Sequence, residues 1–185
     1  MNTLYAILVG ILIALLGYIA GSFLVSFRSQ KPSDYIDHSP IFDIREVLTG
    51  EMTTEGVIYG PLGKVDTRFV AKMNAVWDGD AGTMTENFVY SSGRTQDRKW
   101  TFEMGVNGKF TATAPDIIGV AQGQQSGATV QLTYRIKLPD DAGGYVLDVV
   151  DWMYLLDNGS VMNRSQFRKF GIKVAELVAT FRKAN

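Results

Sequence analysis

The hydrophobic and polar residues divide this chain of 185 residues into an apolar beginning and a long alternating remainder. Residues 4–27 are almost wholly apolar, and the first charged side chain is Arg28. Since a helix rises about 1.5 Å per residue, this stretch would form a helix of roughly 36 Å, which can span a hydrocarbon core of about 30 Å. The pattern therefore predicts a transmembrane anchor over residues 1–28.

A cleaved signal peptide is the competing interpretation of the same stretch. Three features favour the anchor: no Lys or Arg precedes the apolar run, the run is long, and no clean small-x-small cleavage site lies near residues 20–22. We therefore expect association with a membrane through residues 4–27. Gly17 and Gly21 form a G-x-x-x-G spacing, which is typical of a weak helix dimer and also arises by chance.

Residues 29–40 form a polar segment with two prolines, which predicts a linker. The segment contains the single histidine of the chain, His38, which we expect to be solvated rather than catalytic. Residues 41–48 have the pattern of a short helix with Asp43 near its start. From there on, residues 41–185 are predicted to form one domain.

From Thr53 onward the pattern has a period of two, which is typical of strands with one covered and one solvated face. Residues 65–73 have mostly apolar odd positions, and residues 128–138 have apolar even positions. Turn signals recur about every 8–14 residues and predict about ten short strands joined by hairpins. Because closure removes exposed sheet edges, we expect a mainly β fold in which this antiparallel meander closes into a barrel.

One hairpin can be registered from its turn. Residues 91–93, Ser-Ser-Gly, have the composition of a three-residue loop with a left-handed glycine. Counting back from this loop places Glu86 opposite Arg98 on the inner face. A buried charge pair is costly unless it is well hydrogen-bonded or reached by water. The pair is either an internal clamp that fixes the register or part of a polar cluster in a ligand cavity, and the sequence leaves both interpretations open.

Residues 146–171 form a second hairpin, with aromatic residues on its first strand and basic residues on its second. Both faces of the first strand are largely apolar, so the pattern does not fix which face is inward. We expect Trp152 and Tyr154 to form part of the barrel wall. Arg164 or Arg168 would then be available to an interior carboxylate, and an arginine over Trp152 would gain a cation–π contact.

Composition restricts the function further. The chain has no cysteine and a net charge of −1, which excludes thiol chemistry and argues against a nucleic-acid partner. No cofactor or metal site is predicted, since the acidic residues at 78–86 lack the spacing of a calcium loop. No catalytic motif is found, and a two-carboxylate hydrolase using Glu86 with Asp148 or Asp151 is chemically open but has no support from spacing.

Several short motifs together resemble one bacterial family. They are Asp78-Gly79-Asp80 with Gly82, Glu86-Asn87-Phe88-Val89-Tyr90, Gly93, Gln96, Arg98, Trp100, Asp116, Gly119, Ala121, Gly123, Asp151-Trp152-Met153-Tyr154-Leu155, Asn163-Arg164 and Lys169-Phe170-Gly171. The family is domain of unknown function 3833, and the resemblance extends over about residues 35–182. It implies an uncharacterised envelope protein without an assigned activity. It also implies a strand for residues 171–183, whose apolar spacing fits a helix and a strand equally.

Many members of this family are lipoproteins with a cysteine after the apolar segment, whereas this chain has Ser22, Ser26 and Ser29 there. The resemblance, with this departure, implies a single-pass protein of the bacterial inner membrane whose domain faces the periplasm. Arg28 and Lys31 after the apolar run point weakly to the cytoplasm under the positive-inside rule. We follow the family on this point.

A looser resemblance is to the lipocalin-like (calycin) barrels, in which a short helix leads into Gly-x-Trp on the first strand. Here residues 42–44 lead to Gly50, with Met52 in the place of the Trp. The resemblance implies a lipocalin-like barrel, preceded by the transmembrane helix and the short helix.

Charged residues on an otherwise apolar inner face lead to the functional hypothesis. We expect the barrel to bind a small apolar or amphipathic ligand. The expected ligand-binding residues are Glu86, Gln96, Arg98, Trp100, Trp152, Tyr154 and Arg164. The alternative is a structural or interaction protein of the bacterial envelope, with a packed barrel and no ligand.

Overall fold

The computed structural model describes residues 2–184. Backbone contacts divide the chain between Asp34 and Tyr35 into two compact units. The first unit contains α1 (Asn2–Leu24) and the short 3₁₀ helix η1 (Phe27–Ser29). The N-terminal apolar helix expected from the sequence is therefore present.

Length and composition qualify one stretch of α1, Thr3–Gly21, as a membrane span. A signal sequence near the N-terminus has the same two properties, so they do not distinguish an anchor from a leader. Apart from the adjoining residues and the backbone of the helix itself, no described heavy atom lies within 4 Å of a Cβ placed on Gly17 or Gly21. The helix dimer through these two glycines stays a prediction.

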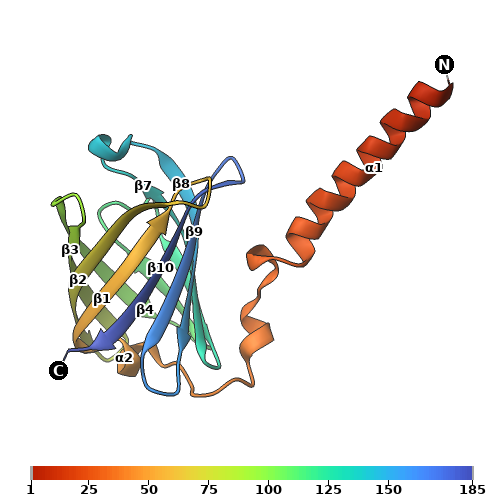
Figure 1. Cartoon of the computed structure of the whole chain (residues 1–185). Helices are drawn as coiled ribbons and strands as arrows, with labels where there is room; N and C mark the ends of the chain where they lie inside the picture. The colour runs from red at the N-terminus through yellow and green to blue at the C-terminus, as the bar shows by residue number, and fades with distance from the viewer. Residues whose placement is uncertain (1, 185) are drawn as a thin grey trace. The chain divides into compact units, whose positions relative to one another are not determined.

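Ten strands of the second unit form a closed antiparallel barrel (Figure 1). The strands are β1 (Gly50–Tyr59), β2 (Val65–Asp78), β3 (Ala81–Tyr90), β4 (Thr95–Met104), β5 (Lys109–Thr113), β6 (Ala121–Ser126), β7 (Thr129–Lys137), β8 (Val146–Leu155), β9 (Val161–Lys169) and β10 (Ile172–Lys183). Each strand pairs with the next, and β10 pairs with β1 to close the barrel. The structure confirms the predicted mainly β meander. It also makes the C-terminal segment a strand.

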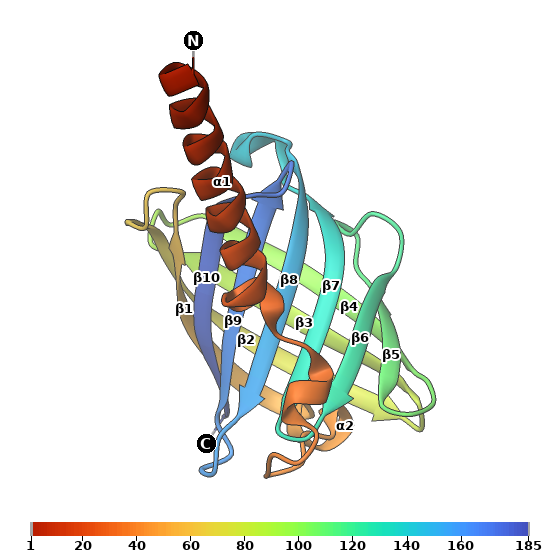
Figure 2. The ribbon, with the colours of Figure 1, turned by 90° about the vertical axis from the view of Figure 1, so that its right-hand side faces the viewer.

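The strands are tilted, so those of the near wall cross those of the far wall in Figure 2. Three short helices accompany them: η2 (Pro32–Tyr35), α2 (Ile44–Val47) and η3 (Asp140–Ala142). Hairpins β1–β2, β3–β4, β7–β8 and β9–β10 all lie at the barrel end opposite α2 (Figure 1). We call this the open end.

Helix α2 closes the other end of the barrel. It is shorter than the predicted helix at 41–48, because Asp43 acts as its N-cap and accepts a hydrogen bond from the Arg45 N–H. Ile44 and Leu48 are buried against the core. The Trp77 indole N–H donates to the Leu48 carbonyl at 2.8 Å, which ties this end of the helix to β2.

Aromatic side chains fill the closed half. Trp100, Phe102 and Phe110 belong to one continuous cluster of buried residues that also contains the α2 side chains. A Cβ at Gly123 would lie 2.2 Å from the Phe110 ring, so only glycine allows that ring to lie flat against β6. This half of the barrel is consequently a packed core.

The wall is shortest at β5 and β6, which have five and six residues. The segment 114–120 between them folds back along β7, where the Lys137 N–H donates to the Asp116 carbonyl at 2.8 Å. The Ile118 N–H donates to the Arg135 carbonyl at 2.9 Å. These two bonds hold Asp116 beside the wall, from where its side chain reaches the interior.

Candidate ligand-binding cavity

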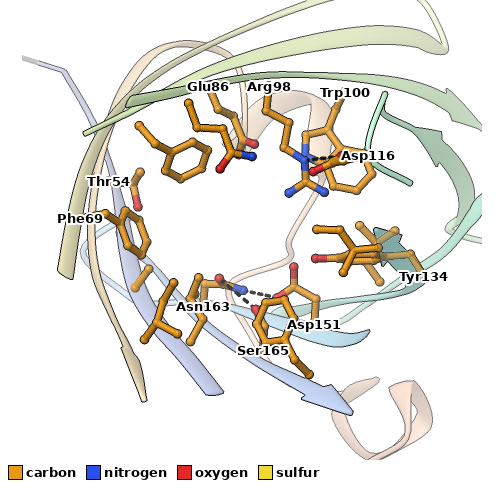
Figure 3. Close-up of a pocket in the computed structure, with 18 of the residues that line it drawn as sticks. Thr54, Phe69, Glu86, Arg98, Trp100, Asp116, Tyr134, Asp151, Asn163 and Ser165 are labelled. Atoms are coloured by element: carbon orange, nitrogen blue, oxygen red, sulfur yellow. Dashed lines mark hydrogen bonds and ion pairs between the residues drawn. The ribbon is translucent and has the colours of Figure 1, made fainter. Parts of the chain in front are cut away.

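A cavity of about 440 Å³ lies inside the barrel. This volume falls within the range of roughly 300–1,000 Å³ typical of small-molecule sites. Apolar and aromatic side chains form most of the lining, and polar side chains near the middle of the strands form a ring around it (Figure 3). We define this ring as the polar belt. Its members are Thr54, Glu86, Arg98, Asp116, Tyr134, Asp151, Asn163 and Ser165.

The β3–β4 hairpin places the two central charges of the belt. Glu86 pairs with Arg98 in the antiparallel register, as the turn composition predicted. The Tyr90 N–H donates to the Arg94 carbonyl at 2.9 Å, and Gly93 has φ of 84°, which fits the left-handed position of this loop. The alternating pattern of β4 then directs Arg98 inward together with Trp100.

Arg98 is held on two sides. Its Nε donates to Asp116 Oδ1 at 3.0 Å, and its guanidinium carbon lies 4.2 Å from the centre of the Trp100 ring, a cation–π arrangement. Its buried Nη2 atom has no hydrogen-bond partner among residues 2–184. Figure 3 shows the terminal guanidinium nitrogens directed toward the hollow. Arg98 is thus fixed in place and retains unused donor capacity.

Glu86 is only 7% exposed, and within the described chain its Oε2 atom also lacks a hydrogen-bond partner. Burial raises the pKa of Glu86 to about 7, because a buried carboxylate loses hydration, while the positive charge of Arg98 acts in the opposite direction. Near neutral pH this side chain therefore exists in both its protonated form, a donor, and its ionised form, an acceptor.

Asp151 lies across the hollow from Arg98 (Figure 3). Its Oδ1 accepts hydrogen bonds from Ser165 Oγ at 2.7 Å and from Asn163 Nδ2. Burial raises the pKa of Asp151, although these two donors favour the charged form and oppose the shift. Burial likewise raises the pKa of the Tyr134 phenol, which stays neutral at physiological pH. Asp151 thus has partners on its own wall, unlike Glu86 Oε2.

The structure brings four of the seven predicted ligand-binding residues together. Glu86, Gln96, Arg98 and Trp100 all line the cavity. Gln96 lies nearer the open end, where its Oε1 accepts a hydrogen bond from the Tyr90 hydroxyl at 2.9 Å.

Trp152, Tyr154 and Arg164 do not line the cavity. On β8 the odd positions, Asp151 and Met153 among them, face inward, so the even positions face outward. Trp152 is nevertheless 0% exposed, because the Tyr35 ring packs on it from outside at a centroid distance of 5.3 Å. This outer cover explains why both faces of the strand are apolar, and we leave these residues out of the site.

Arg164 and Arg168 on strand β9 do not reach an interior carboxylate, which differs from the expectation from the sequence. Arg164 Nε donates to Glu176 Oε1 at 2.7 Å on the outer wall. Arg168 Nη1 donates to the Gly171 carbonyl at 3.1 Å instead of reaching an interior carboxylate. Asp148 faces outward too, 3.7 Å from Arg135, so it cannot share a catalytic site with Glu86. Asp151 is the carboxyl that shares the cavity with Glu86.

Sequence reasoning missed several belt residues. Tyr134 could have been found, because it occupies an inward position in the alternating run of β7. Asn163 and Ser165 depended on the unresolved choice of face in the β8–β9 hairpin. Asp116 had no periodic signal, since it lies in the connection between β5 and β6. No described group of three or more His, Cys, Asp or Glu side chains has the geometry of a metal site.

The closed antiparallel sheet and its hollow interior define the class of this protein as a lipocalin-like β-barrel. The chain belongs to the DUF3833 family of proteins of unknown function, whose family model matches residues 22–183. This match confirms the resemblance found in the sequence and extends it toward the N-terminus. No curated protein matches this chain in sequence.

Solved structures share the fold at low sequence identity. S-type phycobiliprotein lyase CPES from Guillardia theta is 9% identical, with a TM-score of 0.56 over 77% of this chain and 91% of its own. Rv2717c from M. tuberculosis is 14% identical, with a TM-score of 0.56 over 80% and 100%. A DUF3598-family protein of unknown function from Nostoc punctiforme is 13% identical, with a TM-score of 0.55 over 79% and 51%. These likenesses establish the fold alone.

Proposed function

We propose that the barrel binds a small, partly apolar ligand in its cavity. The observation that carries this proposal is three buried polar atoms beside the cavity, Thr54 Oγ1, Glu86 Oε2 and Arg98 Nη2, which have no hydrogen-bond partner among the described residues. Buried polar groups are nearly always paired in folded proteins, and each unpaired one costs about 1–3 kcal/mol. A bound ligand would supply the missing partners.

A purely structural clamp is a weaker explanation of the same residues. Such a clamp gains its stability from complete hydrogen bonding between its own members, since a partly satisfied buried network is worse than an apolar core. Here Arg98 uses its Nε toward Asp116 and leaves Nη2 unpaired. The size of the cavity and its largely apolar lining also favour binding over packing.

Native mass spectrometry of the full-length chain, released from its own membranes in mild detergent, tests this function. We expect a stoichiometric small molecule on the wild type. We expect its loss from Arg98→Met and its retention in Arg164→Met, a matched change of an arginine on the outer wall. Ala175→Leu, which narrows the lining, is a second variant in case Arg98→Met does not fold. A ligand-free wild type would overturn the proposal and favour a structural or interaction protein of the envelope.

We also propose that α1 tethers the barrel to the bacterial inner membrane and that the barrel faces the periplasm. The support is the apolar stretch Thr3–Gly21 together with the resemblance to envelope proteins. Retention of α1 in the mature chain distinguishes an anchor from a signal peptide, and the intact mass of the natural protein decides this point. Loss of about the first 20 residues would contradict the anchor.

The absence of cysteine allows the orientation to be mapped with single introduced cysteines. The substitution Ser92→Cys introduces a cysteine on the exposed β3–β4 turn, and Thr3→Cys introduces one at the start of α1. In cells with a permeabilised outer membrane, a membrane-impermeant maleimide should label Ser92→Cys and spare Thr3→Cys. The reverse labelling pattern would place the barrel in the cytoplasm.

A further inference from the structure

The polar and apolar parts of the cavity are separated along the barrel axis. The polar belt lies near the middle of the strands. Between the belt and the open end the lining contains polar side chains, Gln96 and Arg94 among them, and a larger set of apolar ones, which we define as the apolar collar. Its members are Ile58, Phe69, Phe88, Leu147, Phe167 and Leu177. An amphipathic molecule with its head at the belt would place its tail against the collar.

The closed half of the barrel leaves little surface for a tail. Ile44, Leu48 and Phe110 have exposed fractions of 1–2% and pack into the main core cluster. Four of the six collar residues, Ile58, Phe88, Phe167 and Leu177, have intermediate exposure, whereas Phe69 and Leu147 are 5% exposed. More of the accessible apolar surface therefore lies on the side of the belt that faces the open end.

Apolar side chains continue past the collar to the rim. Leu62 in the β1–β2 connection is 88% exposed, and Phe170 at the tip of the β9–β10 turn is 90% exposed. These two segments are neighbours at the open end, because β1 pairs with β10 (Figure 1). A tail that extends out of the barrel would meet apolar side chains there instead of a uniformly polar edge.

The unpaired atoms of the belt determine the chemistry of the head. Arg98 Nη2 is a charged donor that requires an acceptor oxygen. The protonated form of Glu86 offers a second donor, and Asp151 already accepts bonds from Ser165 and Asn163. A cationic head would pair with the ionised form of Glu86, but it would leave Arg98 Nη2 without an acceptor and bring a second positive charge close to it. A head with a carbonyl or carboxyl oxygen satisfies the unpaired donors directly.

We propose that the ligand is an acyl-chain amphiphile bound head-inward, with a carboxyl or ester carbonyl oxygen at Arg98 and its apolar chain running through the collar to the rim at Leu62 and Phe170. This inference rests on the proposed binding function and specifies the class and the orientation of the ligand. A free carboxylic acid and an ester share the required carbonyl oxygen, and the experiment below separates them.

Photocrosslinking of the full-length chain in lipid nanodiscs tests the orientation. Two C16 fatty acids are compared, one with a diazirine next to the carboxyl group and one with a diazirine near the methyl end. We expect the first to label peptides of β3, β4 and β8 at the belt, and the second to label peptides that contain Leu62, Phe170 or Leu177. Labelling in the reverse order would overturn the head-inward orientation.

Competition against this labelling tests the head group. Dodecanoic acid or its methyl ester should compete, and the better competitor identifies the acid or the ester as the natural class. Dodecylamine, with the same chain and no acceptor oxygen, should compete at least about tenfold less well, because it cannot replace one charge-assisted hydrogen bond. Equal competition by the amine would overturn the assignment of the head group.

A matched pair of variants separates this inference from the broader function. Labelling should fall at least about tenfold in Arg98→Met and stay unchanged in Arg164→Met. Ala175→Leu should also reduce labelling at the collar if Arg98→Met does not fold. If no acyl probe labels the interior while native mass spectrometry detects another bound molecule, the inference fails and the binding function stands. If photocrosslinking and native mass spectrometry both find an empty barrel, the inference and the binding function both fail.

Discussion

Two glutamates with similarly small exposed fractions lie on opposite faces of the barrel wall. Glu176 on β10 faces outward, is 9% exposed and accepts hydrogen bonds from Arg164 at 2.7 Å, Lys173 at 2.7 Å and Gln166 at 3.1 Å. Glu86 on β3 faces inward and is 7% exposed, and its Oε2 has no partner among the described residues. Both oxygens of the Glu176 carboxylate therefore have hydrogen-bond donors on the protein, whereas Glu86 Oε2 has none among the described residues.

The pKa values of the two side chains shift in opposite directions. Burial raises the pKa of Glu86 to about 7. Burial acts in the same direction on Glu176, but Lys173 and Arg164 outweigh it, so the pKa of Glu176 is lowered. A small exposed fraction alone thus does not define a functional site. The two carboxyl groups differ in their hydrogen-bond partners, because Glu176 has three donors on the protein and Glu86 Oε2 has none among the described residues.

The largest expected effect contrasts the two arginines of these clusters. Arg98→Met leaves the partly buried Asp116 and the buried Glu86 without their cation and should lower the free energy of unfolding by about 3–5 kcal/mol. Arg164 is 46% exposed at its side chain, and Glu176 keeps Lys173, so Arg164→Met should cost at most about 1 kcal/mol. Urea unfolding of both variants measures the difference. Equal losses would remove the distinction between the inner and outer clusters.

The pH dependence of stability should differ in sign between the two glutamates. Because its folded pKa is raised from 4.5 to about 7, Glu86 is more easily ionised in the unfolded chain. Its ionisation therefore lowers the free energy of unfolding as pH rises through this window, by on the order of 3 kcal/mol for the ligand-free protein. Asp151, whose pKa is also raised, adds a loss of the same sign.

Glu176 behaves in the opposite way. Its lowered pKa means that its contribution is present above pH 4.5 and is lost as pH falls through the folded pKa. Glu86→Gln should flatten the stability profile between pH 4.5 and about 7, and Glu176→Gln should flatten it on the acid side. Denaturant midpoints measured across pH for the wild type and both variants provide the check. If Glu86→Gln has the same pH profile of stability as the wild type, the pKa of Glu86 is not raised in the folded protein, and the contrast between the two glutamates fails.

The smallest effect concerns two hydroxyl groups. Thr54 Oγ1 is buried in the belt and has no hydrogen-bond partner in the described part of the chain, whereas Thr180 Oγ1 donates to Glu55 at 2.8 Å on the outer wall. Thr54→Val removes an unsatisfied group with little change of shape and should leave stability unchanged or raise it by about 1 kcal/mol. Thr180→Val should lower stability by about 0.5–1 kcal/mol. Thermal unfolding of both variants tests the signs, and a marked loss in Thr54→Val would reveal a satisfied hydroxyl.

Local rules in the sequence were sufficient for the barrel and for four of the residues that line its cavity, Glu86, Gln96, Arg98 and Trp100. The turn at 91–93 set the register that places Glu86 opposite Arg98, because hairpin loop length determines which residues pair. The β8 strand could not be oriented, because Tyr35 covers its outer face at Trp152 and makes both faces apolar. Asp116 depends on long-range pairing of an irregular segment with β7, for which a sequence contains no periodic signal.

An experimental density map of the full-length protein, purified from its own membranes without added lipid, tests the central claim most directly. The account predicts continuous density in the hollow, with an atom at hydrogen-bond distance from Arg98 Nη2 and an extended part directed toward the open end. A barrel whose side chains close the cavity, with Arg98 Nη2 and Glu86 Oε2 bonded to protein atoms, would contradict it. The inner cluster would then be an ion clamp like the one around Glu176.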